Sequence, residues 1–222
     1  ANPWVGTFYA FDGAVFEDGS NYNEVVIKNE FTLRSNINAD VRINSSDDKL
    51  TVPSDANYTI GGSVYLSGNN SSLYATLYIN PKAMLIIGKD VSISSYGLLK
   101  NLGTLNIGGN VTLNYTGTFK NEGTAYINGD FKTNNYDSKV IQESDSAKMH
   151  IRGNMSFNNI NNNALISGGT TIFDGTRPQT LNGQAYNVEI LNKAATMGSL
   201  YVFGRVDANA NPWVGTFYAF DG

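Results

Sequence analysis

A short pattern of apolar and polar positions returns several times along this chain. It consists of an apolar residue, a two-residue turn, one polar residue and an apolar–x–apolar strand, as in IGKDVSI from Ile87, IGGNVTL from Ile107 and INGDFKT from Ile127. Alternation of this kind places one set of side chains on one face of a short β-strand. The even spacing of these copies therefore predicts two or three short strands per repeat.

The same pattern occurs outside this regular region at wider spacing. Copies begin at Ile27 (IKNEFTL), Ile60 (IGGSVYL), Ile151 (IRGNMSF) and Val202 (VFGRVDA), and a degraded copy, ISGGTTI, begins at Ile166. A recurring unit of this size is typical of solenoids, in which each coil buries its apolar face by stacking on its neighbours.

The predicted fold is all-β: a parallel β-helix, or β-solenoid, with coils of about 20 residues and irregular insertions. Tandem Ig-like β-sandwiches are the alternative, because they also combine short strands with Gly- and Asn-rich turns. We expect one elongated unit over residues 1–222, with regular coils at 57–157 and less regular packing in 1–56 and 158–209.

Glycine and asparagine mark the predicted corners between strands. Gly108 and Gly109 are expected to turn a corner because glycine reaches positive φ without steric cost. Asn101 and Asn121 head successive repeats. Asparagines at equivalent corners are expected to stack and to hydrogen-bond along the axis, as identical amides do in ladders.

The two ends of the chain carry the same sequence. Residues 1–13 and residues 210–222 both read ANPWVGTFYAFDG, at an offset of 209 residues, so the chain holds one long period plus a short overlap. The alternation of aromatic and small residues suits a strand that buries one face. These aromatic residues are predicted either to join the solenoid core or to form a junction between units by strand addition: Trp4, Phe8, Tyr9, Phe11, Trp213, Phe217, Tyr218 and Phe220.

The composition of the chain argues against several classes of partner and location. The net charge is −4 and no basic stripe exists, so nucleic-acid binding is not expected. The longest apolar run, Ala83–Ile87, is far short of a membrane span. The lack of cysteine excludes disulfides and thiolate metal sites and fits an extracellular location.

Residues with catalytic potential are few. His150 is the only histidine, and strand alternation places it on an outward face without partners at the spacing of a catalytic triad. Asp90 and Asp130 stand at equivalent corners two coils apart, which suits turn stabilisation better than paired-carboxylate catalysis. We therefore expect no enzymatic activity, no catalytic residues and no cofactor.

An acidic segment, FEDGSNYNE at residues 16–24, is the only candidate for metal binding. It departs from an EF-hand loop because Tyr22 stands at the third ligand position and the glutamate comes too soon. An irregular Ca²⁺ site would use Asp12, Asp18 and Glu24. The alternative interpretation is an acidic, solvated loop.

The segment IFDGTRPQTLNGQAYNVEILN (172–192), followed by LYVFGRVDA, resembles a pattern in large secreted bacterial surface proteins. In those proteins an F-x-G segment, a Q-x-[IL]-x-G turn and an N-[VL]-x-[IL]-x-N strand lead into a V-x-G-x-[VL] coil. The 20-residue blocks resemble the parallel β-helix of haemagglutinin-like adhesins. The resemblance implies export to the cell surface and a structural or adhesive role.

Repetition at two length scales and this resemblance lead to one functional prediction. We expect a structural repeat unit of an extracellular surface fibre, stalk or coat that assembles end to end with other copies of itself. The alternative is an adhesin module that binds glycans or host surfaces.

Overall fold

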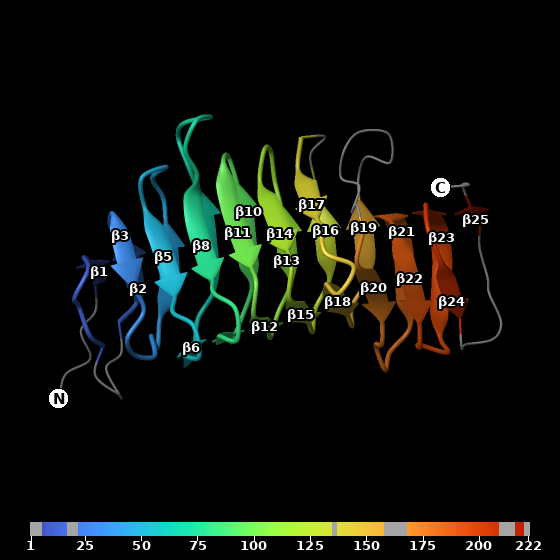
Figure 1. Cartoon of the computed structure of the whole chain (residues 1–222), viewed down its shortest axis with the longest axis horizontal. Coiled ribbons are helices and arrows are strands. Elements are labelled where there is room, and N and C mark those ends of the chain that lie inside the picture. The colour runs from blue at the N-terminus through green and yellow to red at the C-terminus, as the bar shows by residue number, and fades with distance from the viewer. Residues whose placement is uncertain (1–5, 17–21, 135–136, 158–167, 209–215, 220–222) are drawn as a thin grey trace.

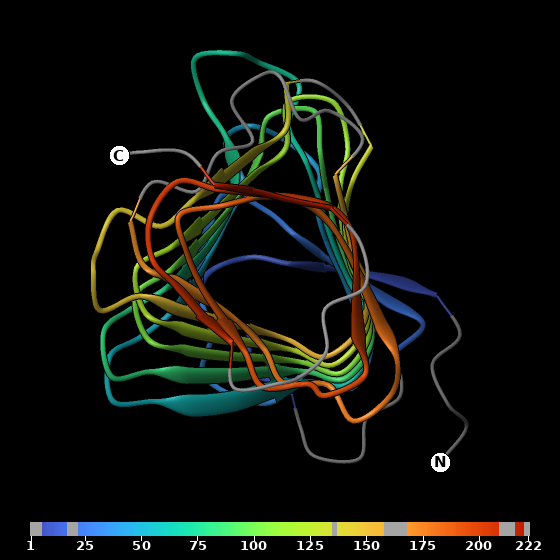
Figure 2. The same cartoon turned by 90° about the vertical axis from the view of Figure 1, so that its right-hand side faces the viewer.

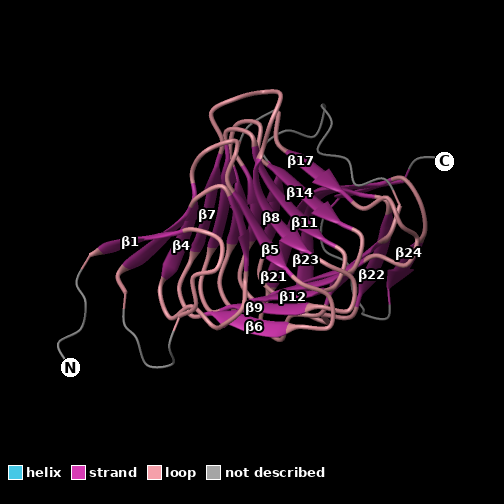
Figure 3. Cartoon of the chain, turned by 60° about the vertical axis from the view of Figure 1, so that its left-hand side comes forward, coloured by secondary structure: helices cyan, strands magenta, loops and turns pink. Residues whose placement is uncertain are grey.

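The computed structural model describes residues 6–16, 22–134, 137–157, 168–208 and 216–219, the last of these by backbone alone. Within these ranges every regular element is a β-strand (Figure 3). The strands form three parallel sheets that stack in about nine coils along one axis (Figure 1). Viewed along that axis, the coils superpose as a rounded triangle (Figure 2). The β-solenoid prediction is confirmed, and the sandwich alternative is wrong because the strands pair in parallel rather than as antiparallel hairpins.

Each coil contributes strands to two or three of the sheets. Sheet A contains, in order along the axis, β1 (Thr7–Ala10), β2 (Glu24–Ile27), β4 (Asp40–Ile43), β7 (Val64–Ser67), β10 (Val91–Ser94), β13 (Val111–Leu113), β16 (Phe131–Thr133), β19 (Met155–Phe157), β21 (Gln179–Ala185), β23 (Ala195–Val202) and β25 (Thr216–Ala219). Sheet B contains β3 (Glu30–Thr32), β5 (Lys49–Val52), β8 (Ala75–Ile79), β11 (Gly97–Asn101), β14 (Thr118–Asn121) and β17 (Lys139–Ile141). Sheet C contains β6 (Asn57–Ile60), β9 (Met84–Ile87), β12 (Thr104–Ile107), β15 (Thr124–Ile127), β18 (Lys148–Ile151), β20 (Thr170–Phe173), β22 (Asn187–Ile190) and β24 (Val206–Ala208).

The core is a set of apolar columns that run along the axis. Ile87, Ile107 and Ile127, the first residues of the regular copies, pair in register in sheet C and are fully buried. Leu99 and Phe119 do the same in sheet B. The alternation read from the sequence therefore places the predicted residues inside, because a strand presents every second side chain to one face.

Coil length varies along the axis. In sheet A, Val91 pairs with Val111 and Val111 with Phe131, so the central coils follow the even spacing of the sequence repeat. Val64 pairs with Val91, which makes a longer coil that holds an insertion between β7 and β8. The coils at the two ends of the stack are short and similar in length.

The glycines at the corners are required for close packing between coils and not for a positive φ. Neither Gly108 nor Gly109 has positive φ, so that part of the corner prediction is wrong. Instead, a Cβ on Gly108 would overlap the carbonyl oxygen of Gly88 in the preceding coil, and a Cβ on Gly109 would overlap Oδ1 of Asp90. Glycine is needed here because the backbones of stacked coils approach closely.

The outward corner next to these glycines carries a ladder of short polar side chains. Oδ1 of Asp90 accepts the backbone N–H of Asn110 (2.6 Å), and Oδ1 of Asn110 accepts that of Asp130 (2.8 Å). Oδ1 of Asp130 in turn accepts the N–H of Asn154 (2.8 Å). Each side chain thus binds the backbone of the next coil, so Asp90 and Asp130 join stacked corners to one another.

Candidate functional sites at the ends of sheet A and on sheet B

The duplicated segment occupies both ends of one sheet. Its strand TFYA forms β1 at the N-terminal end of sheet A and β25 at the C-terminal end (Figure 1). β1 pairs with β2, and β25 pairs with β23. Because all these strands run in parallel, the two copies use opposite edges for their hydrogen bonds. Each copy therefore leaves unpaired, among the described strands, the edge that the other copy uses.

The two copies also share their register with the core. In β1, Phe8 and Ala10 pair with the buried Val25 and Ile27. In β25, the equivalent Phe217 and Ala219 pair with the buried residues Leu200 and Val202. Phe217 and Ala219 therefore hold the same register positions in sheet A as Phe8 and Ala10.

The coils next to the two ends match in length. Thr7 pairs with Glu24 and Leu200 pairs with Phe217, so the same sequence separation closes the coil at each end. In sheet C, Thr170 pairs with Asn187 at that separation as well. Coils of equal length have similar cross-sections, so one end of the solenoid can stack on the other without a step in the chain path.

An aromatic cluster fills the interior at the N-terminal end. Phe16 is buried, and its ring lies 5.6 Å from that of Phe8, 5.7 Å from that of Tyr22 and 6.2 Å from that of Phe31, measured between ring centroids. Phe8 and Tyr22 are only half-buried although they pack on the core. They leave apolar ring surface at the end of the stack, where a further coil would cover it.

The eight predicted junction residues separate into three groups. Phe8 packs inward, whereas Tyr9 and Phe11 are exposed, at 57% and 55%. Phe217 and Tyr218 are placed by their backbone in β25. Trp4, Trp213 and Phe220 lie outside the described residues.

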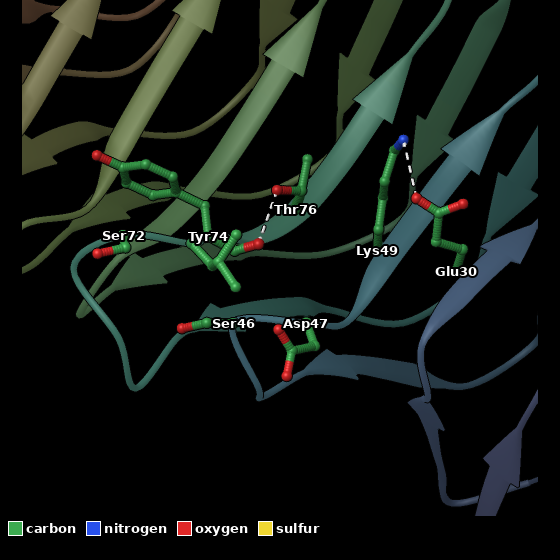
Figure 4. A pocket seen from close by; sticks show the side chains of 8 residues that line it. Glu30, Ser46, Asp47, Lys49, Ser72, Tyr74 and Thr76 are labelled. Atoms are coloured by element: carbon green, nitrogen blue, oxygen red, sulfur yellow. Dashed lines mark hydrogen bonds and ion pairs between the residues drawn. The ribbon is translucent and has the colours of Figure 1, made fainter.

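Sheet B carries a pocket that the sequence pattern did not indicate. It has a volume of about 340 Å³ and lies between the strands β3, β5 and β8 and the insertion before β8 (Figure 4). The lining combines hydroxyl groups, carboxylates, one ammonium group and two exposed apolar side chains: Glu30, Ser46, Asp47, Lys49, Ser72, Leu73, Tyr74 and Thr76. Nζ of Lys49 lies 3.7 Å from Oε1 of Glu30, and both residues line the pocket.

The insertion that forms one wall of this pocket is hydrogen-bonded to the buried Ser46, whose backbone N–H donates to Oδ1 of Asn69 (3.3 Å). Oγ of Ser46 accepts the backbone N–H groups of Asn69 and Asn70, both at 2.8 Å, and lies 3.3 Å from the carbonyl oxygen of Asn70. Oγ1 of Thr76 donates to the carbonyl oxygen of Tyr74 (2.9 Å) where the insertion enters β8. These bonds hold Leu73 and Tyr74 beside the pocket although both side chains are exposed.

Two of the three candidate calcium ligands form ion pairs with arginine side chains. Oδ1 of Asp12 lies 3.4 Å from Arg34, and Oε2 of Glu24 accepts from Nε of Arg42 (2.6 Å). Asp18 lies outside the described residues. In the described part of the chain, no group of three or more His, Asp or Glu side chains could hold a metal ion.

His150 lies on the outer face of β18, as the alternation predicts, but it is packed between neighbours. Its ring stacks on Tyr126, with centroids 4.5 Å apart, and its Nδ1 lies 2.9 Å from Oδ2 of Asp174. Nε of Arg152 lies 3.5 Å from the second oxygen of the same carboxylate. The histidine thus joins a side-chain network that ties three coils together.

No protein-family model, curated protein or solved structure matches this chain. Within the described ranges, no helix is long and apolar enough to cross a membrane. The candidate sites therefore rest on their own geometry.

Proposed function

We propose that this chain is a structural repeat unit of an extracellular fibre, stalk or coat in which units stack end to end. The observation that carries the proposal is the placement of one strand sequence, TFYA, at both ends of sheet A, with opposite edges paired. A strand with both edges paired would continue the sheet from one unit into the next without interruption. Equal coil lengths and a shared register at the two ends support the same arrangement.

A fusion of two 209-residue periods tests this proposal. We expect a single rod, because stacking buries the half-exposed rings of Phe8 and Tyr22 at the internal joint. Small-angle scattering should give an unchanged cross-section and about twice the length of one unit. Two rods joined by a bend would contradict the proposal. Tyr218→Pro at the internal joint is the matched variant, because proline removes a backbone donor from the shared strand and should uncouple the rods.

Location outside the cell is part of the same proposal. The lack of cysteine and the scarcity of charged residues support it, as does the resemblance of residues 172–192 to secreted bacterial surface proteins. Antibody labelling of intact source cells should detect the protein without permeabilisation. Labelling only after permeabilisation would contradict an extracellular location.

The pocket on sheet B favours a second candidate, an adhesin module that binds a glycan. Its lining combines hydroxyl and carboxylate groups with the exposed side chains of Leu73 and Tyr74, and a sugar ring has one polar rim and apolar faces. Two carboxylates, from Glu30 and Asp47, outnumber the ammonium group of Lys49. This balance favours an uncharged sugar over an acidic one.

An array of neutral and acidic oligosaccharides tests the second candidate. We expect binding to neutral glycans that is lost when Leu73 and Tyr74 are both replaced by serine. Tyr115→Ser is the control, because Tyr115 is also an exposed tyrosine (62%) but lies away from the pocket lining. Equal loss in both variants, or selective binding of acidic glycans, would argue against this pocket as the site.

We infer no catalytic role for the chain. The carboxylates of Asp90 and Asp130 accept backbone hydrogen bonds at the corners, and His150 is held between Tyr126 and Asp174. Side chains used in this way support the stacking of coils, which agrees with a mechanical role.

A further inference from the structure

The strands β1 and β25 have the same sequence, so either could occupy the position in sheet A next to β23. β25 fills the position beside β23, and β1 fills the position beside β2. In a continuous stack one strand would fill both positions at once. These 222 residues thus hold two copies of the strand, although a joint between stacked units needs only one.

We propose that separate chains join by strand replacement. β1 of an incoming chain takes the position of β25 beside β23 of the receiving chain, while it keeps its own pairing with β2. The displaced copy at residues 216–219 is released from the sheet. This inference rests on the proposed end-to-end function. The partner is a second copy of this chain. β25 regulates assembly because it occupies the receiving edge until it is displaced.

The register allows the exchange without a change in the receiving end. Leu200 and Val202 of β23 pair with Phe217 and Ala219, and the incoming strand offers Phe8 and Ala10 in the same order. On its other edge, this strand already pairs with the buried residues of β2. Because the two sequences are identical, the receiving edge cannot distinguish the incoming strand from β25 by side-chain chemistry.

Simple docking of the two open edges fits less well. β25 follows β24 directly, and no described strand of sheet C follows β25. Docking β25 against β1 would place two copies of the strand side by side in sheet A without a matching addition in sheet C. The resulting step would be about one strand spacing, ~4.8 Å, on one side of the triangle. Replacement leaves one copy of the strand at the joint and avoids this step in sheet A.

Apolar burial gives replacement a driving force. The exchange conserves strand pairing, because one copy of the strand replaces the other. It also brings the end coil of the receiving chain onto the half-buried rings of Phe8 and Tyr22. Against this gain stands the covalent link of β25 to β23, which holds it at an effective concentration of roughly millimolar. Assembly should therefore be slow and concentration-dependent until β25 is weakened.

Two substitutions at equivalent positions of the duplicated strand test the proposal in the full 222-residue chain. Tyr218→Pro weakens β25 and opens the receiving edge, whereas Tyr9→Pro disables the incoming strand, because a proline within a paired strand removes a ladder hydrogen bond. We expect Tyr218→Pro to assemble at a concentration at least about tenfold below that of the unchanged chain. We expect Tyr9→Pro to stay monomeric.

Assembly is measured by light scattering after size-exclusion chromatography and by negative-stain electron microscopy, with circular dichroism to verify β-structure. Phe8→Asp and Phe217→Asp form a second pair, so that the comparison survives if a proline variant fails to fold. The opposite effects of the two positions within a pair would support replacement. If the unchanged chain assembles and both positions abolish assembly equally, replacement is overturned and edge docking takes its place. If neither the unchanged chain nor any variant assembles, and the two-period fusion also fails to form one rod, the proposed function itself fails.

Discussion

Nδ2 of Asn101 donates to Oδ1 of Asn121 at 2.8 Å, and both side chains are fully buried inside the solenoid. The contact is one step of a longer ladder: Nδ2 of Asn121 donates to Oε1 of Gln142 (3.1 Å), and Nε2 of Gln142 donates to Oγ1 of Thr171 (3.4 Å). The predicted stacking of Asn101 and Asn121 is thus confirmed, and it continues through two further coils. Buried amides are favourable only when their donors and acceptors are paired, so each member depends on the next.

Asn121→Ala should therefore destabilise the protein strongly. It removes the acceptor of Asn101 and the donor to Gln142, and it leaves a small cavity between them. We expect the free energy of unfolding in urea to fall by about 2–4 kcal/mol. Asn134→Ala is the control, because Asn134 donates to Asn114 (2.9 Å) in an exposed amide pair and its loss should cost less than about 0.5 kcal/mol. Similar losses in the two variants would contradict the importance of burial.

Gly108→Ala should also be destabilising, although its φ is not positive. The added Cβ would overlap the carbonyl oxygen of Gly88, and backbone atoms of a stacked coil cannot move aside independently. We expect a loss of about 1–3 kcal/mol in the free energy of unfolding. Gly6→Ala is the matched control, because a Cβ at Gly6 meets no atom within 4 Å. A neutral result at Gly108 would mean that the coils can separate locally at little cost.

The regular coils were predictable because their signal is local. Ile87, Ile107 and Ile127 return at one spacing, and a strand that alternates in sequence must alternate in space. The amide contact between Asn101 and Asn121 follows from the same spacing. The reason for glycine at the corner was not predictable in this way, since the close approach of Gly108 to Gly88 depends on the distance between coils rather than on local conformation.

Contacts that depend on insertions could not be predicted from the sequence either. Ser46 meets Asn69 and Asn70 only because the longest described coil of sheet A folds its extra residues back over the preceding coil. His150 meets Asp174 across a segment whose length follows no repeat. The short coils near β1 could not be recognised from the repeat either. Thr7 pairs with Glu24, and this sequence separation is shorter than that of the regular repeat.

We expect the carboxyl group of Asp130 to make the free energy of unfolding depend on pH. Burial alone would raise the pKa of this carboxyl, but the N–H of Asn154 and the ammonium group of Lys132 (3.0 Å) outweigh burial and hold the pKa below its ordinary value of 3.8. A carboxyl with a lower pKa in the folded than in the unfolded chain adds stability above about pH 4. That contribution is lost as the pH falls through the folded-state pKa.

Asp130→Asn and Asp130→Ala separate the charge from the hydrogen bond. Asparagine keeps the acceptor, as Asn110 shows at the equivalent corner, so at pH 7 we expect a change of less than about 1 kcal/mol. The asparagine variant should also lose less stability than the unchanged protein between pH 5 and pH 3, roughly the range of carboxyl titration. Asp130→Ala leaves the N–H of Asn154 without its acceptor and should cost about 1–2 kcal/mol at pH 7. Urea unfolding at several pH values measures both effects. Identical pH dependence in the unchanged protein and the asparagine variant would contradict the charge effect, and equal stability of the alanine and asparagine variants at pH 7 would contradict the hydrogen-bond effect.

Ser46→Ala should release the insertion above the pocket without unfolding the solenoid. The backbone N–H groups of Asn69 and Asn70 lose their shared acceptor, while the core residues of β5 and β8 keep their pairing. We expect hydrogen exchange at these two amides to accelerate by at least about tenfold, which corresponds to about 1.4 kcal/mol, and exchange in β8 to stay unchanged. Ser72→Ala is the control, because the bond of Ser72 to Asn70 uses its backbone N–H and survives the substitution. If both variants accelerate exchange equally, the buried hydroxyl of Ser46 is not what fastens the insertion.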